Sequence, residues 1–191
     1  MPNWCFNSGS ISGSKESIKK FIKDGLQVET LPENMVEIDE LLQKSEQLTI
    51  GCWLPMPQTY NDFDTTNKPN DFPDAAKEQK EKHGAVGWYD WRMKHYGCKW
   101  DCVFDNFQYT ENNDLGIITF NFDSPWSPPI AWFENMQEKY PELDFEVEYI
   151  ETGMCYAGSG STYRDDDTVY FQYGDYDDYT ESPLYELYEE D

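Results

Sequence analysis

Residues 115–152 read LGIITFNFDSPWSPPIAWFENMQEKYPELDFEVEYIET, and this stretch decides the fold class. Its two ends, "LGIITFNF" and "DFEVEYIET", alternate apolar and polar residues, as strands with one buried face do. Between them, two consecutive prolines suit a first helical turn, and Ile130, Phe133 and Met136 continue at helical spacing until Pro141. A strand, a helix and a second strand are therefore predicted in this order.

The flanking segments extend the pattern in both directions. "CVFDNFQYT" alternates rings and polar residues and is separated from the strand at 115–122 by "ENND", which predicts a hairpin. Near the N-terminus, residues 4–11 read as extended, and Ser14 is placed to cap a short amphipathic helix that Gly25 ends. The order strand, helix, strands, helix, strands indicates an α+β sandwich with both principal helices on one face of the sheet.

The region from about 27 to 96 is less regular and predicts an inserted, mainly helical segment. A weak helical pattern is followed by "LTIGCWLPMP", which reads as a strand stopped by prolines. Residues 58–75 are rich in Asn, Asp, Thr and Pro and predict a surface loop. The stretch that follows predicts two helical pieces, broken at Gly84 and Gly87.

Five short motifs carry a resemblance to a known family: "MPNWCFNSGSISG" at the start, "LPMP" at 54–57, "YGCKWD" at 96–101, "FDSPWSPP" at 122–129 and "YPELDFEVEYIETGMCYAG" at 140–158. Together they resemble the YubB-like family of phage and plasmid proteins, which is described as having a ferredoxin-like domain. The resemblance implies a ferredoxin-like βαββαβ sandwich, carriage by mobile elements and a bacterial cytoplasm. It implies no catalytic residue, because no activity of the family is known to transfer.

On this basis the chain is expected to divide into two parts. Residues 1–164 form the ferredoxin-like α+β domain, with the insertion at about 27–96 and extra strands. Residues 165–191 form an acidic, Tyr-rich C-terminal tail that contains the pattern of a last strand at 168–173.

The charge restricts the partners. The chain has 38 acidic and 14 basic residues, a net charge of −24, of which residues 165–191 carry −11 and residues 1–164 carry −13. This charge repels nucleic acid and anionic membranes, so neither is expected as a direct partner. A compact chain of this length has a diameter of about 42 Å, and that length of duplex DNA carries about 25 charges, so mimicry of DNA is one interpretation.

The cysteines and histidines predict neither a disulfide framework nor a cofactor site. Five cysteines, an odd number spread over 150 positions, indicate reduced thiols in a cytoplasm, and no secretory signal or apolar span is visible at the sequence level. Cys98 and Cys102, with His83 and His95 nearby, suggest zinc ligands, but a second cysteine pair at finger spacing is missing. We therefore predict no metal and no cofactor.

Four residues form an alternative candidate pocket: Lys99, Asp101, Trp126 and Glu151. Lys99 and Asp101 flank Trp100, so in an extended segment they share one face, where a buried lysine and an aspartate are a possible active-site fragment. The simpler interpretation is an ion pair over a core tryptophan, with "DSPWSPP" as a rigid joint that wedges Trp126 into the core. We predict no catalytic residue, and the enzyme remains the alternative.

The tail supplies the candidate partner-binding residues, which are tyrosines on a three-residue repeat and the acids between them: Tyr170, Tyr173, Asp175, Tyr176, Asp177, Asp178, Tyr179, Tyr185 and Tyr188. One interpretation is a solvated acidic tail. The other is a docking surface, since tyrosine is common in interface hot spots and carboxylates attract Lys and Arg.

The leading functional hypothesis is a phage or mobile-element protein that occludes a basic, nucleic-acid-binding host protein in counter-defence, with DNA mimicry as one form of this inhibition. The alternatives are a small-ligand protein or enzyme using the candidate pocket, and a structural accessory protein whose acidity keeps it soluble. The sequence does not indicate the oligomeric state.

Overall fold

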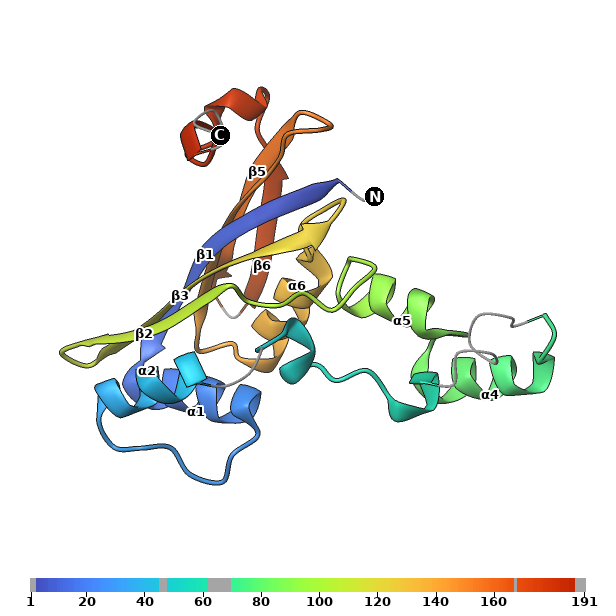
Figure 1. Cartoon of the computed structure of the whole chain (residues 1–191), viewed down its shortest axis with the longest axis horizontal. Helices are drawn as coiled ribbons and strands as arrows, with labels where there is room; N and C mark the ends of the chain where they lie inside the picture. Colours follow the sequence, from blue (N-terminus) through green and yellow to red (C-terminus); the bar gives the residue numbers. More distant parts are fainter. Residues whose placement is uncertain (1–2, 45–47, 62–69, 167, 188–191) are drawn as a thin grey trace.

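A computed structural model of the chain describes residues 3–44, 48–61, 70–166 and 168–187. Its framework is a six-stranded sheet with antiparallel neighbours in the order β2-β3-β1-β4-β5-β6 (Figure 1). The strands are β1 (Trp4–Ser14), β2 (Asn106–Asn112), β3 (Leu115–Pro125), β4 (Asp144–Glu151), β5 (Tyr156–Asp165) and β6 (Thr168–Asp175). The predicted α+β class is confirmed.

Two helices, α1 (Lys15–Leu26) and α6 (Ile130–Lys139), pack on the same face of this sheet, which we call the inner face. The ring centroid of Phe21 in α1 lies 6.0 Å from that of Phe145, and the ring centroid of Phe133 in α6 lies 6.2 Å from that of Phe120. The remaining helical elements are α2 (Met35–Lys44), η1 (Ile50–Cys52), η2 (Gln58–Asn61), α4 (Pro73–His83), α5 (Trp88–His95), η3 (Tyr179–Glu181) and η4 (Tyr185–Leu187).

Six of these elements build the ferredoxin-like fold that the resemblance implies. β1, α1, β2, β3, α6 and β4 follow one another along the chain in βαββαβ order, and their strands stand in the sheet as β4-β1-β3-β2. β5 and β6 extend the sheet beyond β4. The fold is thus a ferredoxin-like sandwich with a long segment between α1 and β2 and two additional strands.

The helix α1 begins where the sequence predicts but ends later. The Ser14 side chain accepts a hydrogen bond from the Ser17 backbone N–H at 3.1 Å, as an N-cap does. The helix continues through Gly25 to Leu26, and Gln27 adopts the left-handed conformation at its end. Gly25 is needed for packing, because a Cβ there would lie 2.1 Å from the Trp53 ring.

Trp53 belongs to the segment "LTIGCWLPMP", for which the strand prediction is wrong. This segment contains the short helix η1 and, among the described residues, makes one isolated bridge, from Thr49 to Val103. Trp53 instead inserts into the core, where its ring stacks on Phe21 with centroids 4.7 Å apart and its indole N–H donates to the Phe21 carbonyl at 2.8 Å. Burial of a large indole, with its N–H satisfied, outweighs the extended pattern.

The inserted helices extend the core beside the two principal helices, since Ile38 and Leu42 of α2 and Trp91 of α5 are buried in the same cluster. α2 runs beside the edge strand β2, where the Asp39 carboxylate accepts a hydrogen bond from the Tyr109 backbone N–H at 3.1 Å. This contact satisfies a donor that an edge strand otherwise leaves open. α4 and α5 project to one side of the sheet (Figure 1). As predicted, the two helices are separated at Gly84, which follows the end of α4, and at Gly87, which precedes the start of α5.

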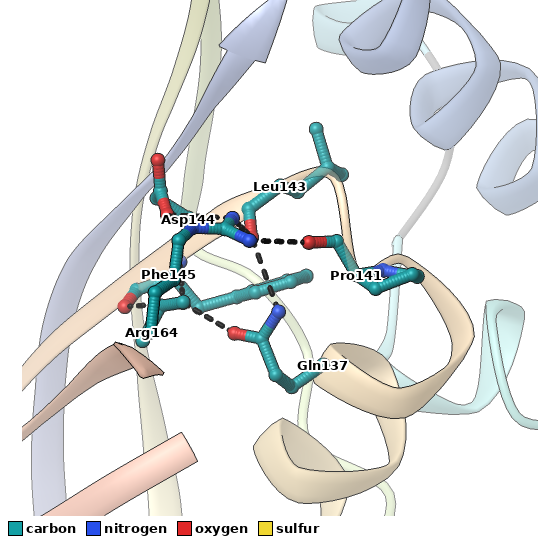
Figure 2. A network of polar contacts seen from close by, with 7 residues as sticks. Gln137, Pro141, Leu143, Asp144, Phe145 and Arg164 are labelled. Atoms are coloured by element: carbon teal, nitrogen blue, oxygen red, sulfur yellow. Dashed lines mark hydrogen bonds and ion pairs between the residues drawn. The ribbon is translucent and has the colours of Figure 1, made fainter. Parts of the chain in front are cut away.

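The expected boundary at residue 164 falls within the β5–β6 hairpin, which pairs Arg164 with Val169 across it, and the strand predicted at 168–173 lies within β6. Arg164 is itself part of the fold, since its guanidinium donates to Asp144 Oδ1 at 2.8 Å and to the Pro141 carbonyl at 2.8 Å (Figure 2). In the same network Gln137 of α6 donates to the Leu143 carbonyl at 3.1 Å. The described part of residues 165–191 is therefore continuous with the folded domain.

The segment after β6 covers one end of the outer face, which is the sheet face opposite α1 and α6. Leu184 is buried there against Ile150 and Ala157, with Phe6 and several tyrosines around them. In Figure 1 this segment, in red, lies beside the end of β5 near the chain terminus. We call residues 176–187 the C-terminal cap.

Candidate functional site

The uncovered part of the outer face is the candidate partner-binding surface. It forms an open furrow of about 540 Å³ over β1, β4 and β5. Its outward side chains are short hydroxyls and carboxylates: Ser8, Ser10, Glu146, Glu148, Ser159 and Ser161. A surface of this chemistry suits a polar, positively charged ligand.

The furrow owes its shape to two Ser-Gly-Ser tripeptides, at 8–10 and 159–161. In each, the central glycine faces the core, and the serines on either side point outward because side chains alternate along a strand. A Cβ at Gly9 would lie 2.1 Å from the Glu146 carbonyl oxygen, and one at Gly160 would lie 2.4 Å from the Phe171 ring. Close packing on the inner face thus leaves small polar side chains outside.

The two furrow carboxylates have different environments. Glu146 is exposed, and the Ser10 hydroxyl donates to it at 3.4 Å. Glu148 is partly buried beside the C-terminal cap, where the Tyr176 hydroxyl donates to it at 2.7 Å. Desolvation raises the pKa of Glu148 above its ordinary value, although the hydrogen bond from Tyr176 opposes this rise.

The charge is distributed unevenly along the chain. Residues 101–191 contain 23 acids and 2 bases, so they carry −21 of the total −24. Both bases make internal contacts: Lys139 donates to the Trp53 carbonyl at 3.1 Å, and Arg164 is bound to Asp144. The half of the chain that supplies β2 to β6 therefore presents carboxylates with little basic charge between them.

The structure separates the tyrosines that the sequence places on one repeat. In β6, Tyr170 pairs with Tyr163 and points outward, whereas Tyr173 pairs with Gly160 and points to the inner side. A repeat of three residues alternates faces on a strand, which has a period of two. Tyr170 and Tyr173 are both exposed, but they do not share one surface.

The other predicted partner-binding residues of the tail are mostly engaged within the fold. Tyr176, Tyr179 and Tyr185 pack into the C-terminal cap. Asp175 accepts a hydrogen bond from the Tyr149 hydroxyl at 2.8 Å, and Asp178 accepts one from the Thr180 backbone N–H at 3.0 Å. Asp177 is exposed, and Tyr188 lies outside the described residues.

The hydrogen bonds at the start of η3 give Asp178 a shifted pKa. Its carboxylate accepts from both the backbone N–H and the hydroxyl of Thr180, and these bonds lower its pKa below the ordinary value. Asp178 is thus a helix cap as well as an exposed acid.

None of the described cavities is lined by more than one of the four alternative pocket residues. A cavity of about 200 Å³ beside Trp4 and Trp100 is lined by Asp101, but not by Lys99, Trp126 or Glu151. The Asp101 carboxylate accepts hydrogen bonds from the Thr49 hydroxyl at 2.9 Å and from the Gly51 backbone N–H at 2.8 Å. Its contacts hold the inserted segment against the domain.

Among the described residues, Lys99 contacts a ring and has no carboxylate partner. Its ammonium lies 5.3 Å from the centroid of Trp100, and among the described residues it forms no ion pair with Asp101. The segment 97–100 is a bend, so Lys99 and Asp101 do not share a strand face, and the interpretation of an ion pair between them over Trp100 is wrong.

Trp126 and Glu151 also differ from their predicted roles. Trp126 is 48% exposed and has a left-handed backbone with φ 73°, so it is not wedged into the core as predicted. The backbone N–H of Trp126 donates a hydrogen bond to the Asn3 carbonyl at 2.9 Å, which stabilises this backbone conformation. Glu151 is 2% exposed and accepts from the backbone N–H groups of Gly153 and Met154 at 2.9 and 2.7 Å, so it stabilises a turn.

The cysteine pair is buried in the core. Cys98 and Cys102 place their sulfur atoms 3.6 Å apart, and a hydrogen bond with Cys98 together with burial raises the pKa of Cys102 far above the ordinary range. Within the described ranges, no group of three His, Cys, Asp or Glu side chains is placed to hold a metal ion. None of the described helices is long and apolar enough to cross a bilayer.

The fold and these contacts define a ferredoxin-like α+β domain with an acidic outer face. Residues 105–190 match a family model described as "Ferredoxin-like domain in Api92-like protein". The match runs from just before β2 through the C-terminal cap and covers somewhat less than half of the chain. The matched residues include β6 and the cap but not β1 and α1.

A solved structure is similar to most of the chain. It is the crystal structure of a protein api92 from Yersinia pseudotuberculosis, which shares 13% sequence identity with a TM-score of 0.42, over 92% of this chain and 98% of that one. A comparison with curated proteins gives no match. No activity is carried over from these comparisons.

Sequence reasoning missed the furrow on the outer face. The sequence signal that could have revealed it is the Ser-Gly-Ser tripeptide, which occurs on two predicted strands. A glycine within a strand indicates a close approach on one face, and the serines on either side of it then lie on the other face. The pairing of β1 with β4 and of β4 with β5, which brings the two tripeptides together, is a tertiary feature.

Proposed function

We propose that this protein is a non-enzymatic acidic binding protein that occludes a basic, nucleic-acid-binding partner. The observation that carries the proposal is the net charge of −21 on residues 101–191, whose two bases are engaged within the fold. Long-range attraction between such a surface and a basic protein accelerates association and suppresses binding to acidic partners.

The outer face is the proposed contact surface. The furrow presents Glu146 and hydroxyl groups that no described helix covers, and the C-terminal cap adds further exposed acids such as Asp177 and Glu181 beside it. The basic surface of a DNA- or RNA-binding protein is complementary to this arrangement, because it is built to contact closely spaced negative charges.

The biological setting is the part of the proposal that rests on resemblance. A protein carried by a phage or plasmid gains from blocking a host nucleic-acid-binding protein, and an acidic surface that competes with DNA achieves this without catalysis. Counter-defence in a bacterial cytoplasm is the corresponding role.

The experiment is release of host proteins from DNA. Bacterial lysate proteins are bound to immobilised duplex DNA at low salt, and the purified chain is added in increasing amounts. We expect a small set of basic proteins to be released, at chain concentrations where an equal charge of polyglutamate releases none. Release of the same proteins by polyglutamate contradicts a specific surface.

A matched pair of variants locates the surface. Glu146→Lys changes an exposed residue of the furrow, and Glu138→Lys makes the same charge change at an exposed position on α6, which covers the inner face. We expect Glu146→Lys to weaken release by about tenfold and Glu138→Lys by less than about threefold, since local charge pairs dominate over net charge at physiological salt. Equal effects of the two variants exclude the furrow as the contact surface.

A further inference from the structure

The cavity beside Trp4 and Trp100 lies outside the furrow and has a different chemistry. The two indole rings have centroids 5.6 Å apart and are tilted by 46°. Trp4 is 49% exposed, although an indole is usually covered in a folded domain. Large exposed rings that line a cavity are typical of ligand or partner sites.

Carboxylates surround these rings. Asp101, Asp105 and Asp123 line the cavity, and none of the residues described as lining it is basic. Asp105 and Asp123 have no ion pair among the described residues, whereas Asp101 is held by Thr49 and Gly51. Two carboxylates that no described basic residue pairs with thus lie beside two partly open indoles.

The strand pairing keeps the carboxylates together. The Asp105 backbone N–H donates to the Asn121 carbonyl at 2.9 Å, two residues before Asp123 on β3. Desolvation, followed by the negative charge of Asp105, raises the pKa of Asp123 above its ordinary value. A bound cation relieves this repulsion.

The ring of Trp100 already attracts a cation of this chain. The Lys99 ammonium lies 5.3 Å from its centroid, but Lys99 does not line the cavity. The face of an indole favours positive charge, and a guanidinium can in addition stack on a ring and bind a carboxylate through two parallel hydrogen bonds. A volume of about 200 Å³ accommodates one such side chain but no large ligand.

We infer that this cavity is a recognition pocket for one arginine side chain of the basic partner, packed against the open surfaces of Trp4 and Trp100 and neutralised by Asp105 and Asp123. The inference rests on the proposed function for the identity of the partner. Arginine anchors in aromatic pockets are common hot spots at interfaces, so the pocket supplies specificity to an encounter that the general charge accelerates.

The test uses the full chain and three capped tripeptides, Ac-Gly-Arg-Gly-NH₂, its lysine counterpart and its citrulline counterpart. Citrulline has the shape of arginine without the charge. NMR signals of the indole N–H groups follow the titration. We expect saturable shifts at Trp4 and Trp100 with the arginine peptide, weaker binding of the lysine peptide, and affinity lower by about tenfold for citrulline.

A double variant and a matched control assign the carboxylates. Asp105→Asn with Asp123→Asn removes two charges at the cavity, and Glu134→Gln with Glu138→Gln removes two exposed charges on α6. We expect about a fivefold loss of affinity for the arginine peptide in the first variant and less than about 1.5-fold in the control. Equal binding of the arginine and citrulline peptides, or equal losses in the two variants, overturns the inference.

The same variants separate this inference from the proposed function. If the cavity variant still releases the same proteins from DNA, or if no indole signal shifts in a saturable way with the arginine peptide, the pocket assignment fails while the proposed function stands. If the arginine peptide binds as expected but the chain releases nothing from DNA, the pocket stands and the proposed function fails.

Discussion

The two faces of the sheet are built by the same strands, but they differ in the substitutions that they tolerate and in the groups that cover them. On the inner face, rings from both principal helices fill the space above the strands, and glycine is required where backbones and rings approach most closely, as at Gly9 and Gly160. On the outer face, the neighbouring serines and glutamates line an open furrow. Stability therefore depends mainly on one face, and the proposed binding function on the other.

The largest expected effect comes from introducing a valine on opposite faces of β1. Gly9→Val introduces a side chain where a Cβ already lies 2.1 Å from the Glu146 carbonyl oxygen, and we expect a loss of at least about 4 kcal/mol in the free energy of unfolding, or no folding. Ser8→Val lies one residue away on the outer face, where we expect a change within about 0.5 kcal/mol. Urea denaturation measures both, and similar losses in the two variants contradict the comparison.

An intermediate effect is expected in the C-terminal cap, where the outer face is covered. Leu184 is 7% exposed and Leu187 is 65% exposed, so these two leucines form a matched pair. We expect Leu184→Ala to cost about 2 kcal/mol and Leu187→Ala to cost almost nothing, because the first removes buried apolar contacts with Ile150 and Ala157. Hydrogen exchange of the cap amides, measured with urea denaturation, shows whether the cap opens alone; equal protection in both variants argues against its packing role.

A smaller effect is expected at Glu111, at the rim of the inner face. Its carboxylate lies 3.0 Å from the Lys15 ammonium and 3.1 Å from that of Lys19, and these partners and the Tyr109 hydroxyl lower its pKa to about 2. Because the folded-state pKa is depressed, this carboxylate stabilises the fold above its unfolded-state pKa, and the contribution disappears as the pH falls toward 2.

We expect Glu111→Gln to cost about 1 kcal/mol at pH 7, with the difference from the unsubstituted chain shrinking between about pH 4.5 and 2. Glu142→Gln is the control, since Glu142 and Lys20 form an exposed pair at 3.8 Å. Denaturation midpoints across this pH range measure both variants. A cost at Glu111 that does not vary with pH indicates a packing effect without a charge contribution.

The periodic parts of the fold could be predicted from the sequence. The alternation in 115–122 and 144–152 and the helical spacing between them correspond to β3, β4 and α6, and Ser14 caps α1 as expected. These features depend on neighbouring residues and on the burial of one face, which a local pattern records.

The parts that depend on distant contacts could not be predicted in this way. Trp53 leaves its extended pattern because the side-chain-free surface of Gly25 makes room for it on α1, 28 positions earlier in the chain. The tyrosine repeat of the tail loses its common face because its first residues lie in β6 and the later ones pack on Ile150. The candidate site likewise arises from strand pairing, which places Ser8 and Ser159 on either side of Glu148.

The most direct test of the proposed function is competition between DNA and this chain for one released host protein. A labelled duplex is bound to that protein near physiological salt, and the chain is titrated in while the anisotropy of the duplex is followed, with size-exclusion chromatography to identify the complexes. Occlusion predicts that the duplex is released completely, that the apparent affinity of the chain weakens in proportion to the DNA concentration, and that Glu146→Lys weakens it more than Glu138→Lys. A complex that contains the duplex, the host protein and the chain together contradicts the account.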